Sequence, residues 1–330
     1  MAHTVYSLPV TAEDGEVRLD RWLRRRFPHL GQGQVEKLIR TGQVRVDGGR
    51  AKASDRVSEG QMVRIPPLPA KTEQRDQNYI PRKDLEFVRR LVIHQDDDII
   101  VIDKPPGLAV QGGTKTTRHL DGLLEGLKFD ADAKPKLVHR LDRDTSGVML
   151  LARHPAAAQK LAESFRTRDA EKIYWAITLG VPAPNRGEIR GWIKKAPGAR
   201  DADRELMRAA EHGEEGAVFA ITDYAVMAEA ARKAAWVALS PHTGRTHQLR
   251  FHMAEKGAPI AGDPKYKNDK PLPGGLADML CLHARAIRFT HPNGKPFEIK
   301  APLPEHMAEG FQLFGFDERE GKDAFAAFRE

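Results

Sequence analysis

Apolar residues recur at the spacing of a helix face in two stretches near the start of the chain. These positions are Leu19, Trp22, Leu23 and Phe27 in the first stretch and Val35, Leu38 and Ile39 in the second. Val44 and Val46 then alternate with polar residues before an Asp47-Gly48 pair, a sequence typical of a β-hairpin turn. The pattern predicts a small ααβ unit over residues 17–66.

The pattern changes after this unit. Residues 67–81 are proline-rich, polar and without periodicity, so we expect them to form a linker. Beyond them, apolar runs typical of strands are separated by glycine and proline turns. The runs are Ile99–Ile102, Val148–Ala152, Tyr174–Leu179 and Ala235–Ser240, and the clearest helical stretch is Ala156–Arg168.

Regular alternation of strands and helices is absent, which predicts an α+β fold with a mixed, largely antiparallel sheet. We expect this second domain to span residues 82–310, followed by a C-terminal extension at 311–330. The Ala/Glu/Arg-rich piece at 199–215 is predicted to be a surface excursion.

The distribution of charge sharpens the interpretation of the first unit. Residues 17–66 contain twelve Lys or Arg and five Asp or Glu, so they account for the whole net charge of +7. An excess concentrated on about 50 residues favours nucleic-acid binding over a merely solvated face. We expect Arg24, Arg25, Lys37 and Arg40 to be among the side chains of this unit that bind nucleic acid.

Several other classes of protein are disfavoured by the sequence. The segment at 107–112 has the first glycine spacing of a P-loop, but Gly113 stands where the phosphate-binding lysine belongs. His247 and His252 are five residues apart without a further metal-ligand motif, so we expect structural histidines and no metal site. Ser146 lacks the preceding glycine of a hydrolase nucleophile elbow and is expected to bond within its own turn.

The chain is also expected to act away from membranes. It has one cysteine, Cys281, which suits a reducing compartment, and its first residues lack the basic and apolar regions of a secretory signal. We therefore expect a cytoplasmic protein with no membrane partner.

One polar turn, "HRLDRDTSG" at residues 139–147, resembles the signature of the RluA/RluC/RluD family of RNA pseudouridine synthases. Four other segments resemble that family in the same order: "DDDIIVIDKPPGLAV", "KIYWAITLG", "SPHTGRTHQLRFHM" with "GAPIAGDPKY", and "LCLHARAIRFTHP". Residues 17–66 resemble an S4 RNA-binding domain, and with "VRIPP" at 63–67 they make the chain most similar to the RluC subgroup.

This resemblance implies roles for individual residues. Asp142 is expected to be the catalytic carboxylate, which either attacks the nucleoside or removes a ribose proton, whereas Asp144 is expected to cap the turn. A carboxylate beside a poorly solvated base pocket needs a cation to stay ionised. Arg250 matches the family arginine that pairs with it, with Arg245 as the alternative. Tyr174 matches the tyrosine that lies against the target base.

The remaining matches concern access to the target base. Arg140 is expected to fill the stack that the uridine leaves when it is extruded. His139 and Leu282 are expected to shape the pocket. The family chemistry implies no cofactor and no nucleotide partner, and it implies 23S ribosomal RNA as the substrate. Two alternatives stay open: a synthase that modifies tRNA, and a noncatalytic RNA-binding or ribosome assembly factor.

Overall fold

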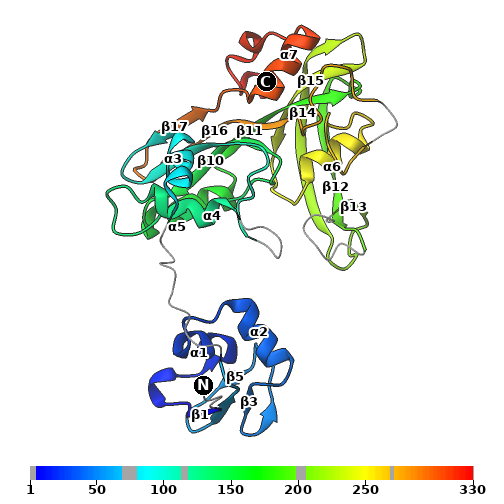
Figure 1. Cartoon of the computed structure of the whole chain (residues 1–330). Coiled ribbons are helices and arrows are strands. Elements are labelled where there is room, and N and C mark those ends of the chain that lie inside the picture. Colours follow the sequence, from blue (N-terminus) through cyan, green and yellow to red (C-terminus); the bar gives the residue numbers. More distant parts are fainter. Residues whose placement is uncertain (1–4, 69–79, 113–117, 198–205, 268–270, 330) are drawn as a thin grey trace. The chain divides into compact units, whose positions relative to one another are not determined.

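The computed structural model describes residues 5–68, 80–112, 118–197, 206–267 and 271–329 (Figure 1). The chain divides into two compact units, with the division between residues 79 and 80. The predicted linker at 67–81 falls largely on residues 69–79, which lie outside the described part of the chain.

The first unit packs two helices against small antiparallel sheets. Its elements are β1 (Tyr6–Pro9), η1 (Ala12–Asp14), β2 (Val17–Arg18), α1 (Leu19–Arg26), α2 (Gln32–Arg40), β3 (Arg45–Val46), β4 (Gly49–Arg50), β5 (Arg56–Val57) and β6 (Met62–Ile65). One sheet has the order β1-β6-β3-β4, and β2 pairs with β5. Leu19, Trp22 and Val35 are almost fully buried, so the helix faces predicted from periodicity form the core. The predicted helices and the hairpin at Asp47-Gly48 are confirmed.

The second unit is built on one large mixed sheet. Its strands are β7 (Val92–Gln95), β8 (Ile99–Lys104), β9 (Lys136–Leu137), β10 (Ser146–Ala152), β11 (Glu171–Leu179), β12 (Arg186–Lys195), β13 (Met207–Ala210), β14 (Val218–Ala230), β15 (Ala234–Pro241), β16 (Leu282–Thr290) and β17 (Pro296–Lys300). The order is β13-β12-β14-β15-β11-β16-β10-β8-β7, with β17 beside β16 and β9 beside β10. Among the described pairs, β10 and β16 run parallel and the others antiparallel. The predicted largely antiparallel sheet is therefore confirmed.

Helices lie around this sheet. They are α3 (Arg82–Arg90), α4 (Leu120–Leu123), η2 (Leu124–Leu127), α5 (Pro155–Thr167), α6 (Gln248–Glu255), α7 (Glu305–Phe314), η4 (Glu318–Gly321) and η5 (Ala326–Phe328). Each of the four predicted strands lies within an observed one, and α5 matches the predicted helix. The piece at 199–215 is not only a surface excursion, because its described part contains β13, which pairs with β12 and forms the edge of the sheet. Residues 198–205 lie outside the described part.

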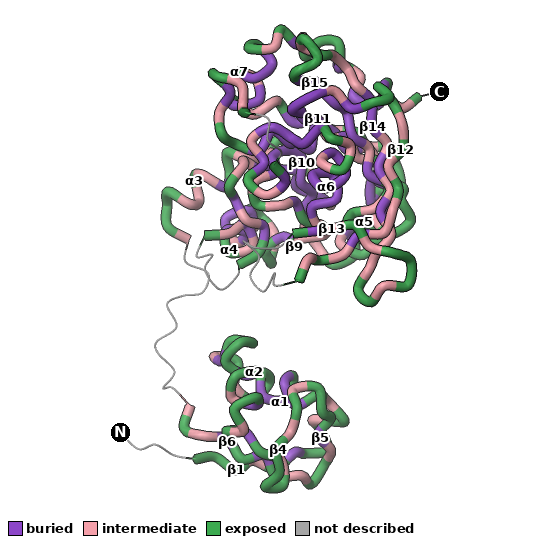
Figure 2. Tube along the Cα trace, turned by 90° about the vertical axis from the view of Figure 1, so that its right-hand side faces the viewer, coloured by how far each residue is buried: buried purple, intermediate pink, exposed green. Residues whose placement is uncertain are grey.

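The central strands carry the core of this unit (Figure 2). Trp175 of β11 and Trp236 of β15 are fully buried with ring centroids 4.7 Å apart, and Phe311 of α7 packs on both rings. A Cβ on Gly321 would lie 2.4 Å from the Trp175 ring, so the chain can pass there only as glycine. The expected domain boundary at residue 310 lies inside α7, and the segment after it packs on the same core.

Candidate active site

The turn at residues 138–145 leads into β10 and is fixed by contacts at several points. Buried Lys104 donates hydrogen bonds of 2.9 Å to the carbonyls of Pro105, Leu108 and Arg143, which ties the turn to the end of β8. Nε2 of His139 accepts the amide hydrogen of Leu150 at 2.8 Å. These contacts hold the segment that carries Asp142 in one position.

Gly147 explains why this turn can sit so close to β16. Its φ is +108°, and a Cβ there would lie 2.3 Å from the carbonyl oxygen of Ala284. Glycine is therefore required by both the backbone conformation and the close approach. Ser146 beside it does not bond within its own turn, contrary to the expectation from the sequence, because its Oγ lies 2.9 Å from Nδ1 of His283 on β16.

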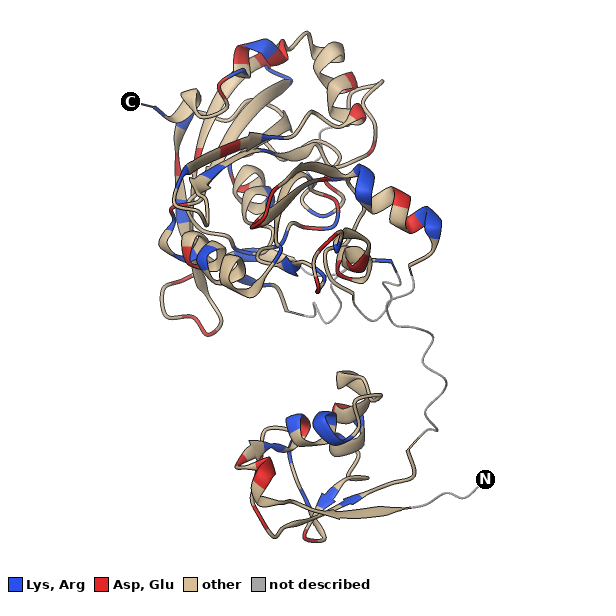
Figure 3. Ribbon diagram, turned by 90° about the vertical axis from the view of Figure 1, so that its left-hand side faces the viewer, with Lys and Arg blue, Asp and Glu red and all other residues tan. Residues whose placement is uncertain are grey.

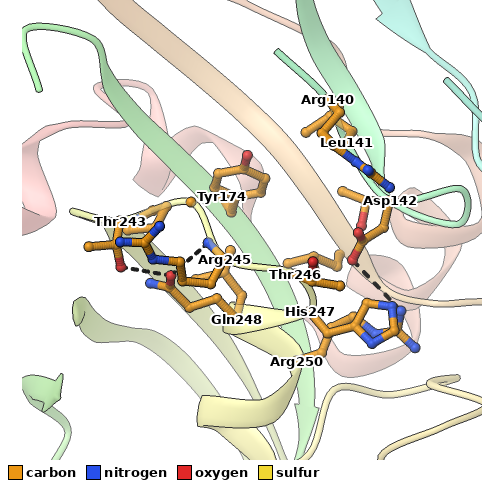
Figure 4. A pocket seen from close by; sticks show the side chains of 15 residues that line it. Arg140, Leu141, Asp142, Tyr174, Thr243, Arg245, Thr246, His247, Gln248 and Arg250 are labelled. Atoms are coloured by element: carbon orange, nitrogen blue, oxygen red, sulfur yellow. Dashed lines mark hydrogen bonds and ion pairs between the residues drawn. The ribbon is translucent and has the colours of Figure 1, made fainter. Parts of the chain in front are cut away.

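Five of the predicted site residues line one pocket (Figure 4). Arg140 and Asp142 reach it from the turn, Tyr174 from β11, Arg250 from α6, and Leu282 from the start of β16. The segment between β15 and α6 lines the pocket with Thr243, Arg245, Thr246 and His247, and Gln248 at the start of α6 also lines it. Residues more than 100 positions apart in the sequence thus converge on Asp142.

Burial and positive charge act in opposite directions on Asp142. Its side chain is 23% exposed, and its Oδ2 lies 3.8 Å from Nη1 of Arg250, whose side chain is 2% exposed. Burial raises the pKa of Asp142 above its usual value, and the nearby charges of Arg250, Arg140, Lys265 and Lys104 offset only part of that rise.

The principal partner of Arg250 is Asp263, a residue that the sequence analysis did not single out. Its two carboxylate oxygens accept hydrogen bonds of 2.7 and 2.6 Å from Arg250, and both side chains are almost completely buried. Oδ1 also accepts the amide hydrogens of Lys265 and Tyr266. Burial alone would raise the pKa of Asp263, but these hydrogen bonds bring it below its usual value. The expected direct pairing of Arg250 with Asp142 is therefore the longer and weaker of its two ion pairs.

The need to neutralise the buried charge of Arg250 could have identified Asp263 from the sequence. A buried arginine is stable only with a hydrogen-bonded carboxylate, and Asp142 cannot serve both as that partner and as a free reactive group. The sequence "GAPIAGDPKY" that follows α6 contains one acidic residue, Asp263.

Tyr174 and His247 both stay in their neutral forms. Burial and the charge of Asp142 raise the pKa of the Tyr174 phenol above its usual value. Burial lowers the pKa of His247 to about 3, and its Nδ1 lies 3.0 Å from the hydroxyl of Tyr266. His252 lies 3.0 Å from Oγ1 of Thr222. Both histidines thus have hydrogen-bond partners within the fold, and His247 also lines the pocket. Among the described residues no cluster of three or more metal-binding side chains occurs.

The other predicted residues lie outside the pocket. His139 stacks near Phe165, with ring centroids 4.6 Å apart, and lines a neighbouring groove instead. Asp144 forms an ion pair with Arg143 at 3.1 Å. Arg24, Arg25, Lys37 and Arg40 lie on α1 and α2 of the first unit, where basic side chains are frequent (Figure 3). No helix within the described ranges combines the length and apolarity needed to cross a bilayer.

Comparison with known protein families gives two matches. The profile described as "RNA pseudouridylate synthase" matches residues 98–255, and the "S4 domain" profile matches residues 17–63. The first match contains Asp142, Tyr174 and Arg250. The second confirms the predicted N-terminal S4 domain.

Individual relatives are similar over most of the chain. "Ribosomal large subunit pseudouridine synthase C" of Rickettsia bellii is 36% identical over 88% of this chain and 95% of its own length. The protein of the same name from Vibrio vulnificus is 34% identical over 89% of this chain and 92% of its own length. Among solved structures, "Human RNA Pseudouridylate Synthase Domain Containing 4" has a TM-score of 0.59 and 29% identity, covering 71% of this chain and 97% of that one.

Proposed function

The chain belongs to the RNA pseudouridylate synthase family, and from this premise we propose that it converts specific uridines of large-subunit ribosomal RNA to pseudouridine with Asp142 as catalytic carboxylate. Support for the target comes from relatives named ribosomal large subunit pseudouridine synthase C, whose similarity extends over most of the chain. The catalytic assignment rests on the carboxylate of Asp142, which faces the pocket between Tyr174 and buried Arg250.

The reaction needs little beyond a held base and a carboxylate. The N1–C1′ bond breaks, the base turns within the pocket, and a C5–C1′ bond forms, while C5 loses a proton and N1 gains one. All heavy atoms stay in the same nucleotide. Asp142 acts either by attack on the nucleoside or by removal of a ribose proton, and both routes use its ionised form.

Arg250 and Tyr174 have supporting roles in this proposal. The positive charge of Arg250 partly offsets the negative charge of Asp142. Asp263 fixes the guanidinium of Arg250 by two hydrogen bonds, so the cation stays in position as the reaction proceeds. The raised pKa of Tyr174 disfavours a phenolate base and favours a ring that packs against the uracil.

Arg140 lies exposed at the entrance to the pocket and is the proposed filler of the stack vacated by the uridine. Arg140→Ala should lower kcat/KM most on a uridine held in a stacked stem-loop and least on one in an unstacked strand. Steady-state rates on the two RNAs check this role, and equal losses on both would contradict it.

Mapping pseudouridines in cells with and without this protein tests the proposed function. We expect specific sites in large-subunit ribosomal RNA to disappear on deletion and to return with the wild-type gene, and we expect the protein to work in the cytoplasm, where that RNA is assembled. Loss of sites in tRNA would redirect the target, and an unchanged set of sites in every RNA would favour a noncatalytic assembly factor.

A further inference from the structure

A second hollow opens beside the pocket and shares its wall. It borders on the same Arg140, Tyr174, Pro241, Thr243, Gly244 and Arg245, and continues along the end of α5 and the start of β11. We call it the basic groove, because five of its lining side chains are Lys or Arg: Arg140, Arg166, Arg168, Lys172 and Arg245. Phe165 lies among them. None of the described residues that line it is Asp or Glu.

The acidic residues nearest in sequence to Arg166, Arg168 and Lys172 have other principal partners or form only a weak ion pair. Asp169 accepts hydrogen bonds from Ser164 and from Thr290 on β16. Glu171 pairs with Arg288 at 2.6 Å, also on β16. Glu163 forms an ion pair with Arg166 at 3.3 Å, in which both side chains are more than half exposed, and such a pair is weak. Arg166, Arg168 and Lys172 therefore keep most of their positive charge, while Asp223 lies 2.6 Å from Nε2 of His242, which lines another part of the groove.

Side chains alternate between the two faces of β11, and this alternation places Lys172 of the groove on the same face as Tyr174 of the pocket. Side chains two residues apart on a strand point to the same face, so Lys172 shares its face with Tyr174 while Glu171 points to the other. Both Lys172 and Tyr174 line the groove. Burial, and after it the charge of Arg168, lowers the pKa of Lys172.

Two rings, those of Phe165 and His139, line the groove among these charged side chains. Phe165 lies 5.9 Å from Nζ of Lys172 and 4.6 Å from the ring of His139. His139 is held neutral, since burial lowers its pKa to about 3. A cationic rim over an aromatic floor is the usual combination for single-stranded nucleic acid.

We propose that the basic groove binds the sugar-phosphate backbone of the nucleotides that flank the target uridine on one side, with Arg166, Arg168 and Lys172 contacting phosphodiester groups. This inference rests on the proposed function, because it takes the uridine in the neighbouring pocket as its starting point. An extruded base brings its own backbone to the entrance of the pocket, and the groove offers that backbone a continuous positive surface.

The competing explanation is local. Arg166 and Arg168 end α5, and cations at a helix C-terminus are stabilised by the helix dipole without any ligand. That explanation accounts for two arginines on α5 but not for Lys172 on β11 or Arg245 before α6 at the same surface.

The test compares two double variants of the full chain. Arg166→Gln with Arg168→Gln removes charge from the groove. Arg232→Gln with Lys233→Gln is the matched control, since both residues are exposed in the β14–β15 turn, at the other end of β15 from Pro241. Affinity for a short single-stranded RNA with one uridine is measured over a salt series, and KM and kcat are measured on large-subunit ribosomal RNA.

We expect the groove variant to raise KM several-fold and leave kcat unchanged. The slope of log affinity against log salt should flatten by about 1.4, because each phosphate of a single strand that a cation neutralises contributes roughly 0.7. The control should match the wild type in both measurements. Lys172→Gln should flatten the slope by a further 0.7 or so.

Equal slopes for the groove variant and the control would overturn the proposal and leave the helix-dipole explanation. Failure of the proposed function has a different signature: the wild type itself would form no pseudouridine on ribosomal RNA, while the salt slopes would still decide whether RNA occupies the groove.

Discussion

At the scale of single residues, Asp142 and Asp144 form an internal comparison. The two carboxylates are two positions apart, but Asp142 faces the pocket while Asp144 pairs with Arg143. Asp142→Asn keeps the shape and removes the charge, so we expect pseudouridine formation to fall by at least about 10³-fold with RNA affinity little changed. Asp144→Asn should retain most of the activity. A turnover assay with both variants checks the assignment, and the reverse order of losses would show that the wrong aspartate was chosen.

The raised pKa of Asp142 also predicts an effect on stability. A group whose pKa is higher in the folded protein favours folding when it is protonated, so this contribution is lost as pH rises through the folded pKa. Asp142→Asn should therefore melt at a higher temperature than the wild type near pH 7, and the difference should shrink as the pH falls through the raised pKa. Thermal melts across this range measure it. A Tm below that of the wild type at neutral pH would mean that the ionised carboxylate stabilises the fold.

Sequence and resemblance identified five of the residues that face the pocket but not those that hold them in place. Asp142, Tyr174 and Arg250 are in segments that resemble the family, and the structure brings all three to one pocket. Asp263 and Lys104 were missed because their function depends on burial and on partners that a sequence does not display. A lysine that donates to three backbone carbonyls looks, in the sequence, like any surface lysine.

At the scale of elements, the clear predictions came from apolar periodicity. The two helices of the first unit, α5, and the inner strands β8, β10, β11 and β15 have apolar runs that only burial explains. The strands β12 and β13 at one edge were not predicted. In β12, exposed and half-buried positions alternate at first, but Ile193 is its one fully buried residue, so no apolar run marks the strand. The four residues of β13 form a strand because β12 offers backbone groups beside them.

The Arg250–Asp263 pair joins α6 to the loop that follows it, which gives a prediction at this scale. Either Arg250→Met or Asp263→Leu alone leaves a buried charge without its partner and should cost about 3–5 kcal/mol of unfolding free energy. The double variant should recover much of that stability, since no orphan charge remains, and yet stay inactive because Asp142 no longer has its cation. Chemical unfolding and turnover of all three variants provide the check. Additive losses in the double variant would show that the two residues act independently, and an active double variant would remove Arg250 from the catalytic role.

At the scale of the whole molecule, the excess of positive charge is concentrated in residues 17–66 of the first unit. Residues 17–66, which contain the S4 domain, have twelve basic and five acidic side chains, and the basic side chains predicted from the sequence lie on α1 and α2. Arg26 of α1 forms an ion pair with Asp14 at 2.9 Å. This arginine is therefore partly neutralised within the protein and is less available to RNA than a cation without such a pair. The described residues that line the active-site pocket all belong to the second unit.

This division predicts that affinity and catalysis can be separated. In the full chain, replacing Arg24, Arg25, Lys37 and Arg40 together with Gln should weaken RNA binding and flatten the salt slope by about 3, at roughly 0.7–0.9 for each phosphate that is no longer neutralised. The maximal rate at saturating RNA should survive, because the chemistry belongs to the other unit. If these side chains only keep the protein soluble, the variant and the wild type will give parallel lines in the salt series. A fall in kcat with an unchanged slope would instead mean that the S4 domain orients the RNA at the active site rather than supplying electrostatic affinity.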